Sequence, residues 1–515
     1  MWTLWVAYSI GAIPLSYATE MTLTFVPLLA ATSAVYILIK LYQIFTNPLN
    51  AIPGPWYAKF TGLPGTIATL KRQQVQYYHR LHQQYGPFVR ASPDQVFVSD
   101  VKAFKTIHKV GSQFTKAEYY HYFGPTEAGS PPYGLFQMTD QHAHSQRRKL
   151  LGRGFTSSSL RADWEDMVRE KVTMALEGMT IDAKIASGEV DMRKWWILMA
   201  CDVVSKLMFG ESFDALKAGK EDPWFEEVNF ANTAAFTALS FPWLYAVTKR
   251  LPFIGSLRMF RSYKVLLDKG RIAVKNSKQA AASQASNLFS KVLFQAEKDE
   301  SSLTDMDICV EAAAFMIAGT DTTSNTLTYG IWAVLLRPEL QTALENEVLG
   351  LSDNFTDAEL ERLPVLHAVI EETLRLYGAA PTPLPRVVPT GGIQLGGYHL
   401  PAGTDVATQS WTLHRDPENF SDPESFDYSR WMPDGESTNS ETAKAAFTPF
   451  GAGSRVCIGR HLAEMELRYG ITMFFRKFQG ARLSPATTPE SMEMDNLVLI
   501  EPRGKTCKVI LSHKR

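Results

Sequence analysis

The sequence predicts a mainly α-helical protein with a minor β portion, preceded by an N-terminal transmembrane helix. Strand-like runs cluster at 88–100 and 386–410, where Gly and Pro turn signals separate short apolar stretches. With 515 residues, 45% of them hydrophobic and 20% charged, the chain is long enough for two domains or one large composite domain. Helical periodicity fills most of the remainder, with long candidate helices at 158–178, 194–209, 304–335, 338–350, 357–378 and 458–477.

Charge and cysteine content exclude two classes of protein. The net charge of -1 gives no electrostatic basis for binding nucleic acid. The cysteines lie far apart and include no CxxC pair, so neither a disulfide framework nor a zinc cluster is expected, and the thiols should face a reducing compartment. They are Cys201, Cys309, Cys457 and Cys507.

The N-terminal segment departs from the composition of a globular protein. Its first 39 residues carry a single charge, Glu20, and residues 21–39 after it are uncharged. A helix needs about 20 apolar residues to cross a bilayer, so this run predicts a membrane anchor. A cleaved signal peptide would carry positive charge before the apolar run, whereas the first positive residue here is Lys40. A buried core helix is the alternative, and Pro27 would kink the helix in either setting.

We expect three parts along the chain. Residues 1–46 are the anchor, with the main span at 21–39, residues 47–56 form a Pro-rich hinge, and residues 57–515 form the catalytic domain. The stretch 1–19, broken by Gly and Pro, could lie at the membrane surface or form a second span. Positive residues after the span place the catalytic domain on the cytoplasmic face. These residues are Lys40, Lys59 and Lys71.

The stretch 450–460, FGAGSRVCIGR, surrounds Cys457 with glycines and arginines. A thiolate that ligates a metal needs backbone N–H donors near the sulfur, and glycines let the backbone approach that closely. Helical periodicity resumes at Ile458, so Cys457 should lie at a helix N-terminus, where the dipole favours an anionic thiolate. A buried structural cysteine is the alternative for a lone thiol.

This string resembles, position for position, the haem-binding signature of the cytochrome P450 family: Phe, two residues, Gly, one residue, Arg, one residue, Cys, one residue, Gly. The resemblance extends over essentially the whole chain and implies the cytochrome P450 fold. It implies that Cys457 is the thiolate ligand of a haem b iron. Residues of the same string would form the haem site: Phe450 shielding the sulfur, Gly453 and Gly459 giving close approach, and Arg455 neutralising a propionate.

A second motif, EETLR at 371–375, places Glu372 and Arg375 on one face of a helix. Pairs at this spacing are usually solvated surface bridges worth a few tenths of a kcal/mol. The family resemblance instead implies a buried network with a second arginine, which PESFDYSRW (423–431) supplies as Arg430. The family usually has proline at the position of Tyr428, and this departure leaves the local turn open.

The third motif, AGTDTT at 318–323, sits within a long predicted helix although Gly and Thr are poor helix formers. It resembles the oxygen-binding groove of the family. The resemblance implies that Thr322 hydrogen-bonds the bound dioxygen and that Asp321 relays protons to it. A helix whose threonines merely face solvent is the alternative.

Two further stretches resemble propionate-binding positions of the family. In HAHSQRRKL (142–150) the candidates are His144 and Arg148, with Arg147 able to serve instead. A basic helix face that contacts a redox partner is the competing interpretation. Arg386, in PTPLPRVV, is the third candidate.

The resemblance implies a membrane-anchored monooxygenase of the endoplasmic reticulum, similar to filamentous-fungal members that act in secondary metabolism. Its electrons would come from NADPH through a separate cytochrome P450 reductase, because the chain contains no GxGxxG motif. Dioxygen and an apolar small molecule would be the substrates. Two alternatives remain: the same chemistry could give desaturation, ring closure or phenol coupling, or the protein could be a non-enzymatic haem-binding membrane protein.

Overall fold

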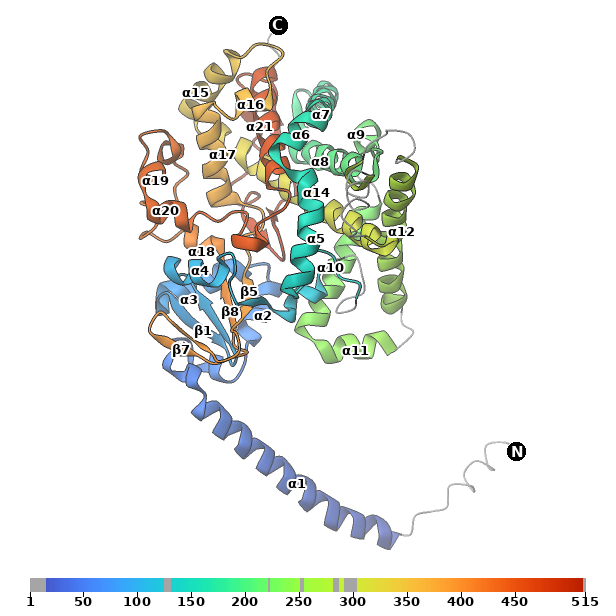
Figure 1. The fold of residues 1–515 in the computed structure, drawn as a ribbon, viewed down its shortest axis with the longest axis vertical. Helices are drawn as coiled ribbons and strands as arrows, with labels where there is room; N and C mark the ends of the chain where they lie inside the picture. Colours follow the sequence, from blue (N-terminus) through green and yellow to red (C-terminus); the bar gives the residue numbers. More distant parts are fainter. Residues whose placement is uncertain are drawn as a thin grey trace, which may run out of the picture.

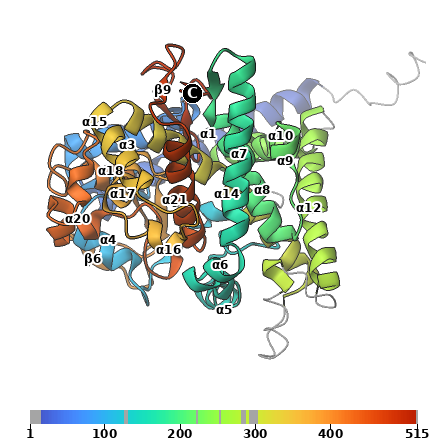
Figure 2. The ribbon, with the colours of Figure 1, turned by 90° about the horizontal axis from the view of Figure 1, so that it is seen from above.

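The fold is organised around α14 (Asp305–Leu335), which lies between two groups of helices in the computed structural model (Figures 1 and 2). A capping box starts this helix, since Thr304 accepts from the backbone N–H of Asp307 and the Asp307 carboxylate accepts from that of Thr304. Helices α8, α12, α17 and α21 pack against it. The structure describes residues 15–124, 131–220, 223–250, 254–280, 287–290 and 303–512.

The prediction of a mainly helical protein is confirmed. The longer helices besides α14 are α3 (Gln74–Tyr85), α5 (Gln141–Gly152), α7 (Glu165–Ile185), α8 (Met192–Phe209), α10 (Trp224–Ser240), α12 (Ile254–Ala280), α15 (Pro338–Leu349), α17 (Pro364–Tyr377) and α21 (Arg460–Lys477). The shorter ones are α2 (Leu63–Leu70), α4 (Val101–His108), α6 (Ser157–Asp163), α9 (Ala215–Ala218), α11 (Pro242–Arg250), α16 (Asp357–Leu360), α18 (Ser410–His414), α19 (Glu436–Asn439) and α20 (Glu441–Ala446).

The β portion lies mainly in one five-stranded sheet with the order β1-β2-β8-β5-β3, at the end of the molecule nearest α1 (Figure 1). Only the β2–β8 pair is parallel. The strands of the five-stranded sheet are β1 (Phe88–Ser92), β2 (Gln95–Val98), β3 (Thr115–Lys116), β5 (Leu384–Val387) and β8 (Asp405–Thr408). The smaller sheets are β4 (Glu189–Asp191) with β12 (Lys508–Ile510) and β9 (Arg482–Leu483), β6 (Ile393–Leu395) with β7 (Tyr398–Leu400), and β10 (Met494–Asn496) with β11 (Ile500–Pro502).

Two predicted helices are divided. The run 158–178 contains α6 and α7, which are separated at Trp164. The run 357–378 contains two helices, because α16 ends at Leu360 and α17 begins with Pro364. Proline favours the first position of a helix and disfavours helical backbone in the residue before it. Leu363 accordingly has extended backbone, with ψ of 114°. The break gives α17 its own N-terminus, where the Glu347 carboxylate accepts from the backbone N–H groups of Val365 and Leu366, both over 2.8 Å.

The N-terminal helix α1 (Leu15–Thr46) projects away from the rest of the protein (Figure 1). Within it, Pro27–Thr46 is long and apolar enough to cross a membrane, and none of that window is buried inside the protein. Apolar side chains such as Leu38 (64% exposed) therefore have no protein partner to cover them. Of the stretch 1–19 considered as a second span, residues 1–14 lie outside the described residues.

The Pro-rich segment 47–56 is attached to the sheet. Its Leu49 and Ile52 side chains are buried, and Arg90 of β1 donates to the Asn50 side chain over 2.6 Å. The backbone N–H of Arg90 donates to Pro53 O over 2.8 Å. These contacts fix where α1 leaves the folded part of the chain.

Candidate active site

The loop around Cys457 joins α20 to α21 and is closed by a hydrogen bond from the Cys457 N–H to Phe450 O (2.9 Å). Gly453 has φ of +63°, and a Cβ there would collide with the carbonyl of His108, the last residue of α4. Only glycine combines this backbone with this approach. Phe450 is partly buried against the main core and lies beside the Arg460 guanidinium, 5.7 Å from its ring centroid.

The four cysteines differ in accessibility. Cys457 is solvent-accessible, whereas Cys201, Cys309 and Cys507 are buried. Surrounding protein nevertheless raises the pKa of the Cys457 thiol, while the Gly459 N–H and the charge of Arg148 oppose this. Protein thus surrounds the Cys457 thiol, and water can still reach it. A metal ion would deprotonate it outright.

Basic side chains gather around His144 in a group that we call the cation cluster: Lys116, Arg148, Arg386 and Arg455. Arg148 brings this cluster close to the Cys457 thiol. Strand pairing sets Lys116 opposite Arg386, because β3 and β5 are neighbours. His144 and Arg148 share one face of α5 at i,i+4 spacing. Burial, together with the positive charges of all four cations, lowers the pKa of His144 to about 3.

The cation cluster carries uncompensated positive charge. In the described part of the chain, none of its four cations forms an ion pair with a carboxylate. Burial and the neighbouring Arg386 lower the pKa of Arg455 to about 10, and burial also lowers that of Lys116. Buried cations normally have anionic partners. The cluster could therefore neutralise the carboxylates of an anionic group held beside Cys457.

The two adjacent arginines of α5 have different partners. Arg148 lies close enough to Cys457 for its charge to lower the thiol pKa. Arg147 instead pairs with Glu311 (2.9 Å) and Asp307 (2.6 Å) of α14. The structure thus separates the candidates, with Arg148 in the cation cluster and Arg147 in an ion-pair network with α14.

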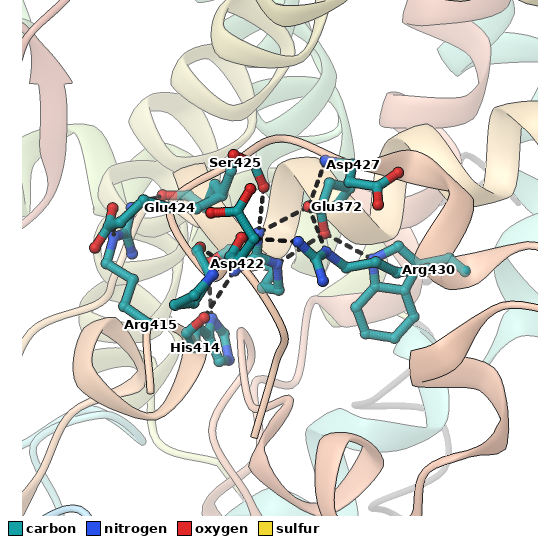
Figure 3. Close-up of polar contacts among 12 residues, drawn as sticks. Glu372, His414, Arg415, Asp422, Glu424, Ser425, Asp427 and Arg430 are labelled. Atoms are coloured by element: carbon teal, nitrogen blue, oxygen red, sulfur yellow. Dashed lines mark hydrogen bonds and ion pairs between the residues drawn. The ribbon is translucent and has the colours of Figure 1, made fainter. Parts of the chain in front are cut away.

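The Glu372–Arg375 pair is fully buried, with both side chains 0% exposed, so it is not a surface bridge. Figure 3 shows Glu372 and Arg430 in the network of polar contacts around this pair. Two hydrogen bonds of 2.7 and 2.8 Å join the guanidinium to the carboxylate. Arg430 approaches the same carboxylate at 3.4 Å. The remaining Arg375 N–H groups donate to the backbone carbonyls of His414, Pro423 and Ser425, at 2.6–2.8 Å. This network ties α17 to the chain that leads into the Cys457 loop.

The turn around Tyr428 forms without the proline usual in the family. Residues Tyr428–Trp431 make a 3-10 turn (η5) that begins where the Asp427 side chain accepts from the Ser429 N–H. The Asp427 N–H itself donates to Glu372 (2.8 Å). An aspartate cap thus replaces the conformational restriction of proline.

The AGTDTT motif lies in the middle of α14, which continues through it as one α-helix. The Thr322 hydroxyl donates to Ala318 O over 2.6 Å, and Asp321 beside it is partly buried. Thr323 donates to the buried Glu466 of α21 at 3.3 Å. A Cβ at Gly319 would lie 2.5 Å from Val204 Cγ2, so this glycine allows α14 and α8 to cross closely.

Three residues of this region were not predicted from the sequence. Lys116 belongs to the cation cluster, Trp431 donates to Glu372 (2.8 Å), and Glu466 links α21 to α14. Trp431 follows Arg430 directly, so its position in that motif was an available signal. Lys116 gives no such signal, because only the pairing of β3 with β5 brings it to Arg386.

The fold and site define a haem-thiolate oxidoreductase, and the sequence comparisons agree. The sequence model described as Cytochrome P450 matches residues 53–508, so the chain belongs to the cytochrome P450 family and is an enzyme of its monooxygenase class. Family membership implies haem with an axial thiolate.

The chain is similar over most of its length to fungal members of the family. It is 40% identical over 494 residues (94% of this chain, 96% of the relative) to the cytochrome P450 monooxygenase cypX of Dothistroma septosporum. It is 40% identical over 475 residues (91% and 89%) to stcB of Emericella nidulans. It is 39% identical over 485 residues (92% and 94%) to aflV of Aspergillus parasiticus. The resemblance to filamentous-fungal cytochromes P450 is thereby confirmed.

Proposed function

We propose that the protein is a membrane-anchored haem-thiolate monooxygenase that oxidises an apolar small molecule with electrons supplied by a separate reductase. The observation that carries this proposal is the accessible Cys457 thiol beside a cation cluster without carboxylate partners. Thiolate-ligated haem supplies the chemistry, which is the activation of dioxygen. In this assignment Cys457 ligates the iron, and Arg148, Arg386, Arg455 and Lys116 bind the propionates.

The Cys457 loop prepares the sulfur for this role. The Gly459 N–H donates to Sγ of Cys457, which limits the electron density that the ligand gives to the metal. Gly459 is also the N-cap of α21, so the positive end of the helix dipole lies at the sulfur. We assign Phe450, which is partly buried against the core, to shielding the sulfur.

On α14, we assign proton delivery to Asp321 and Thr322. The Thr322 hydroxyl donates its own proton to Ala318 O, so its oxygen lone pairs remain available to accept a hydrogen bond. An acid at the adjacent position can replace a proton that the hydroxyl passes on. Both residues are partly buried, which limits the access of bulk water to them.

For the cellular setting, we assign residues 1–46 to a membrane anchor, 47–56 to a spacer and 57–515 to the catalytic domain. The main span is 21–39, which overlaps the apolar segment Pro27–Thr46 of α1 and leaves Lys40 directly after it. Lys40, Lys59 and Lys71 favour the cytoplasmic side, and we place the enzyme in the endoplasmic reticulum membrane. NADPH would act through a cytochrome P450 reductase that docks on the folded domain.

The substrate is assigned by class only. Apolar side chains of α14 and aromatic residues near 114–136 favour an apolar molecule, and the similarity to fungal monooxygenases supports a role in secondary metabolite biosynthesis. Residues 125–130 of that stretch lie outside the described residues. Oxygen insertion is the expected outcome. Desaturation, ring closure or phenol coupling is the second candidate, because the same residues would support it.

The first test asks whether the Cys457 thiolate ligates the haem iron. The reduced, carbon monoxide-treated protein should show the long-wavelength Soret band of thiolate ligation, and Cys457→Ser should abolish it. A band that persists in the variant, or its absence in the wild type, overturns the proposal.

Reconstitution with reductase and NADPH then tests catalysis, since a non-enzymatic haem protein would not consume NADPH with any substrate. Labelled dioxygen separates oxygen insertion, which labels the product, from coupling, which does not.

A further inference from the structure

Residues 134–139, which we call the 134–139 loop, lie directly on α14. The backbone N–H of Leu135 donates to both carboxylate oxygens of Glu311, at 2.9 and 3.1 Å. A Cβ built on Gly134 would lie 3.3 Å from Val310 Cγ1 and 3.8 Å from Ala314 Cβ. The N-terminal end of the loop is thus held by an anion on the helix that carries the proposed proton-delivery residues.

The other end of the same loop is held by cations. Lys116 donates from Nζ to Phe136 O. Arg455 donates to Met138 O at 2.8 Å and approaches Thr139 O at 3.4 Å. At one end of the loop a backbone N–H thus donates to a carboxylate. At the other end, backbone carbonyls accept from the ammonium group of Lys116 and the guanidinium group of Arg455. The backbone of this loop therefore links Glu311 to two members of the cation cluster through hydrogen bonds at its two ends.

Glu311 is 0% exposed and belongs to a three-residue ionic group. The charged groups that face it are Arg147 from α5, at 2.9 Å, and Asp307 one turn earlier on α14, which also pairs with Arg147. Two carboxylates thus share one guanidinium. Burial raises the pKa of Glu311 to about 7, with Asp307 adding to this effect and with Arg147 and the Leu135 N–H opposing it. The charge of this carboxyl therefore changes near neutral pH.

We propose that Glu311 is a positioning residue that fastens the 134–139 loop to α14, so that the loop carbonyls hold Lys116 and Arg455 in place at the haem edge. The role of those two cations rests on the proposed function, whereas the attachment of Leu135 does not. A proton on one Glu311 oxygen removes an acceptor from the Leu135 N–H and weakens the ion pair with Arg147. The loop attachment should therefore loosen as the pH falls through the pKa of Glu311.

Amide hydrogen exchange of the full-length, haem-containing protein tests this inference. We would compare peptides that cover Leu135 at about pH 6 and about pH 8, after correction for the intrinsic pH dependence of exchange. In the wild type, we expect exchange at Leu135 to be roughly tenfold faster at the lower pH, because an opening that costs about 1.4 kcal/mol less is tenfold more populated. Glu311→Gln should exchange rapidly and equally at both pH values.

The matched control is Asp307→Asn, on the same helix and beside the same arginine. Asp307 does not contact the loop, so this variant should keep the slow exchange at about pH 8. Its pH midpoint should move down, because one negative charge next to Glu311 is removed. Slow exchange at Leu135 in Glu311→Gln, or equal loosening in both variants, would overturn the proposal.

A second variant covers the case in which Glu311→Gln does not fold. Glu311→Asp keeps the charge and the pairing with Arg147 but withdraws the carboxylate by one methylene, so Leu135 should lose protection at both pH values. Unchanged protection in this variant also overturns the proposal. The carbon monoxide spectrum keeps the two ideas separate, since it reports thiolate ligation and not the attachment of the loop.

Discussion

The indole N–H of Trp431 donates a 2.8 Å hydrogen bond to Oε2 of Glu372. The same oxygen accepts from Nε of Arg375 at 2.8 Å. The other oxygen, Oε1, accepts from Arg375 (2.7 Å), from the Asp427 N–H (2.8 Å) and from Arg430 (3.4 Å). This buried carboxylate is thus fully hydrogen-bonded, which is the condition under which a buried ion pair is tolerated.

Trp431→Phe removes one of these donors and leaves the aromatic packing largely intact. We expect the free energy of unfolding to fall by about 1–3 kcal/mol, because one side of a buried carboxylate becomes unsatisfied. Urea unfolding followed by circular dichroism measures the change. The control is Trp56→Phe, at a residue 76% exposed, which should leave the midpoint in place. Equal midpoints for the two variants would contradict the role of the indole N–H.

Glu372→Gln and Glu441→Gln form a second pair of variants. Both glutamates pair with a basic residue three positions later, but Glu372 and Arg375 are 0% exposed whereas Glu441 and Lys444 are 89% and 50% exposed. Breaking the buried pair leaves arginines without a counterion and should cost roughly 3–5 kcal/mol. Breaking the exposed pair should cost a few tenths of a kcal/mol at most. Similar thermal midpoints for the two variants would show that burial does not set the strength of this interaction.

Arg148→Met and Arg147→Met distinguish the two arginines of α5. Loss of Arg148 removes one cation from the cation cluster, and we expect haem to transfer to apomyoglobin roughly tenfold faster. Arg147→Met keeps all four cluster cations, so haem transfer should change much less. It should instead destabilise the fold by several kcal/mol, because the buried Glu311 loses its counterion. Faster haem transfer in Arg147→Met than in Arg148→Met would show that Arg147, and not Arg148, helps to bind the haem.

The cysteine loop and the Glu372–Arg375 pair could be predicted from the sequence because each is encoded in a short local string. Gly453 and the i,i+3 spacing of Glu372 and Arg375 can be read directly from the sequence. The mainly helical fold class could be predicted for the same reason, because the hydrophobic periodicity of long helices is a local pattern of the sequence. The division of 357–378 was missed although Pro364 marks it, because the apolar pattern continues across the break.

Contacts between distant parts of the chain could not be predicted in this way. From the sequence, Arg148 is the candidate and Arg147 could serve instead, and only the contact of α5 with α14 shows that Arg147 pairs with Glu311. Lys116 joins the cation cluster through β3–β5 pairing across about 270 residues of sequence. Site residues of this kind depend on register and helix rotation, which tertiary packing determines.

Deletion of residues 1–46 tests the anchor. We expect the truncated chain to fold and to leave the membrane pellet on an alkaline carbonate wash, because the deletion removes the apolar segment Pro27–Thr46. The spacer stays attached to the sheet through Asn50 and Arg90, so the deletion does not disturb the domain. The full chain with Ile185→Arg, a change at a residue 81% exposed on α7, should remain in the pellet. A truncated chain that stays in the pellet after this wash would show that α1 is not the principal anchor.

The stability of the protein should fall in mild acid because of buried histidines, and His414 gives the clearest case. Its Nδ1 lies 2.8 Å from Arg375 O, and its Nε2 accepts from the Thr448 N–H at 2.9 Å. These partners require the neutral ring with hydrogen on Nδ1, since a second proton on Nε2 would face the Thr448 donor. Burial, together with the charges of Arg375 and Arg415, lowers the pKa of His414 from 6.5 to about 3, although the hydrogen bond to Arg375 O opposes this.

Between these two pKa values the unfolded chain binds a proton at His414 that the folded protein does not bind. The free energy of unfolding should therefore decrease as the pH falls below about 6.5, with His414 contributing at most about 1.4 kcal/mol per pH unit. His414→Gln keeps a donor and an acceptor but cannot titrate, so its urea midpoint should depend less steeply on pH across this window. His399→Gln, at an exposed position of β7, serves as the control and should retain the wild-type slope. Identical slopes in both variants would mean that His414 is not held neutral by its two backbone partners.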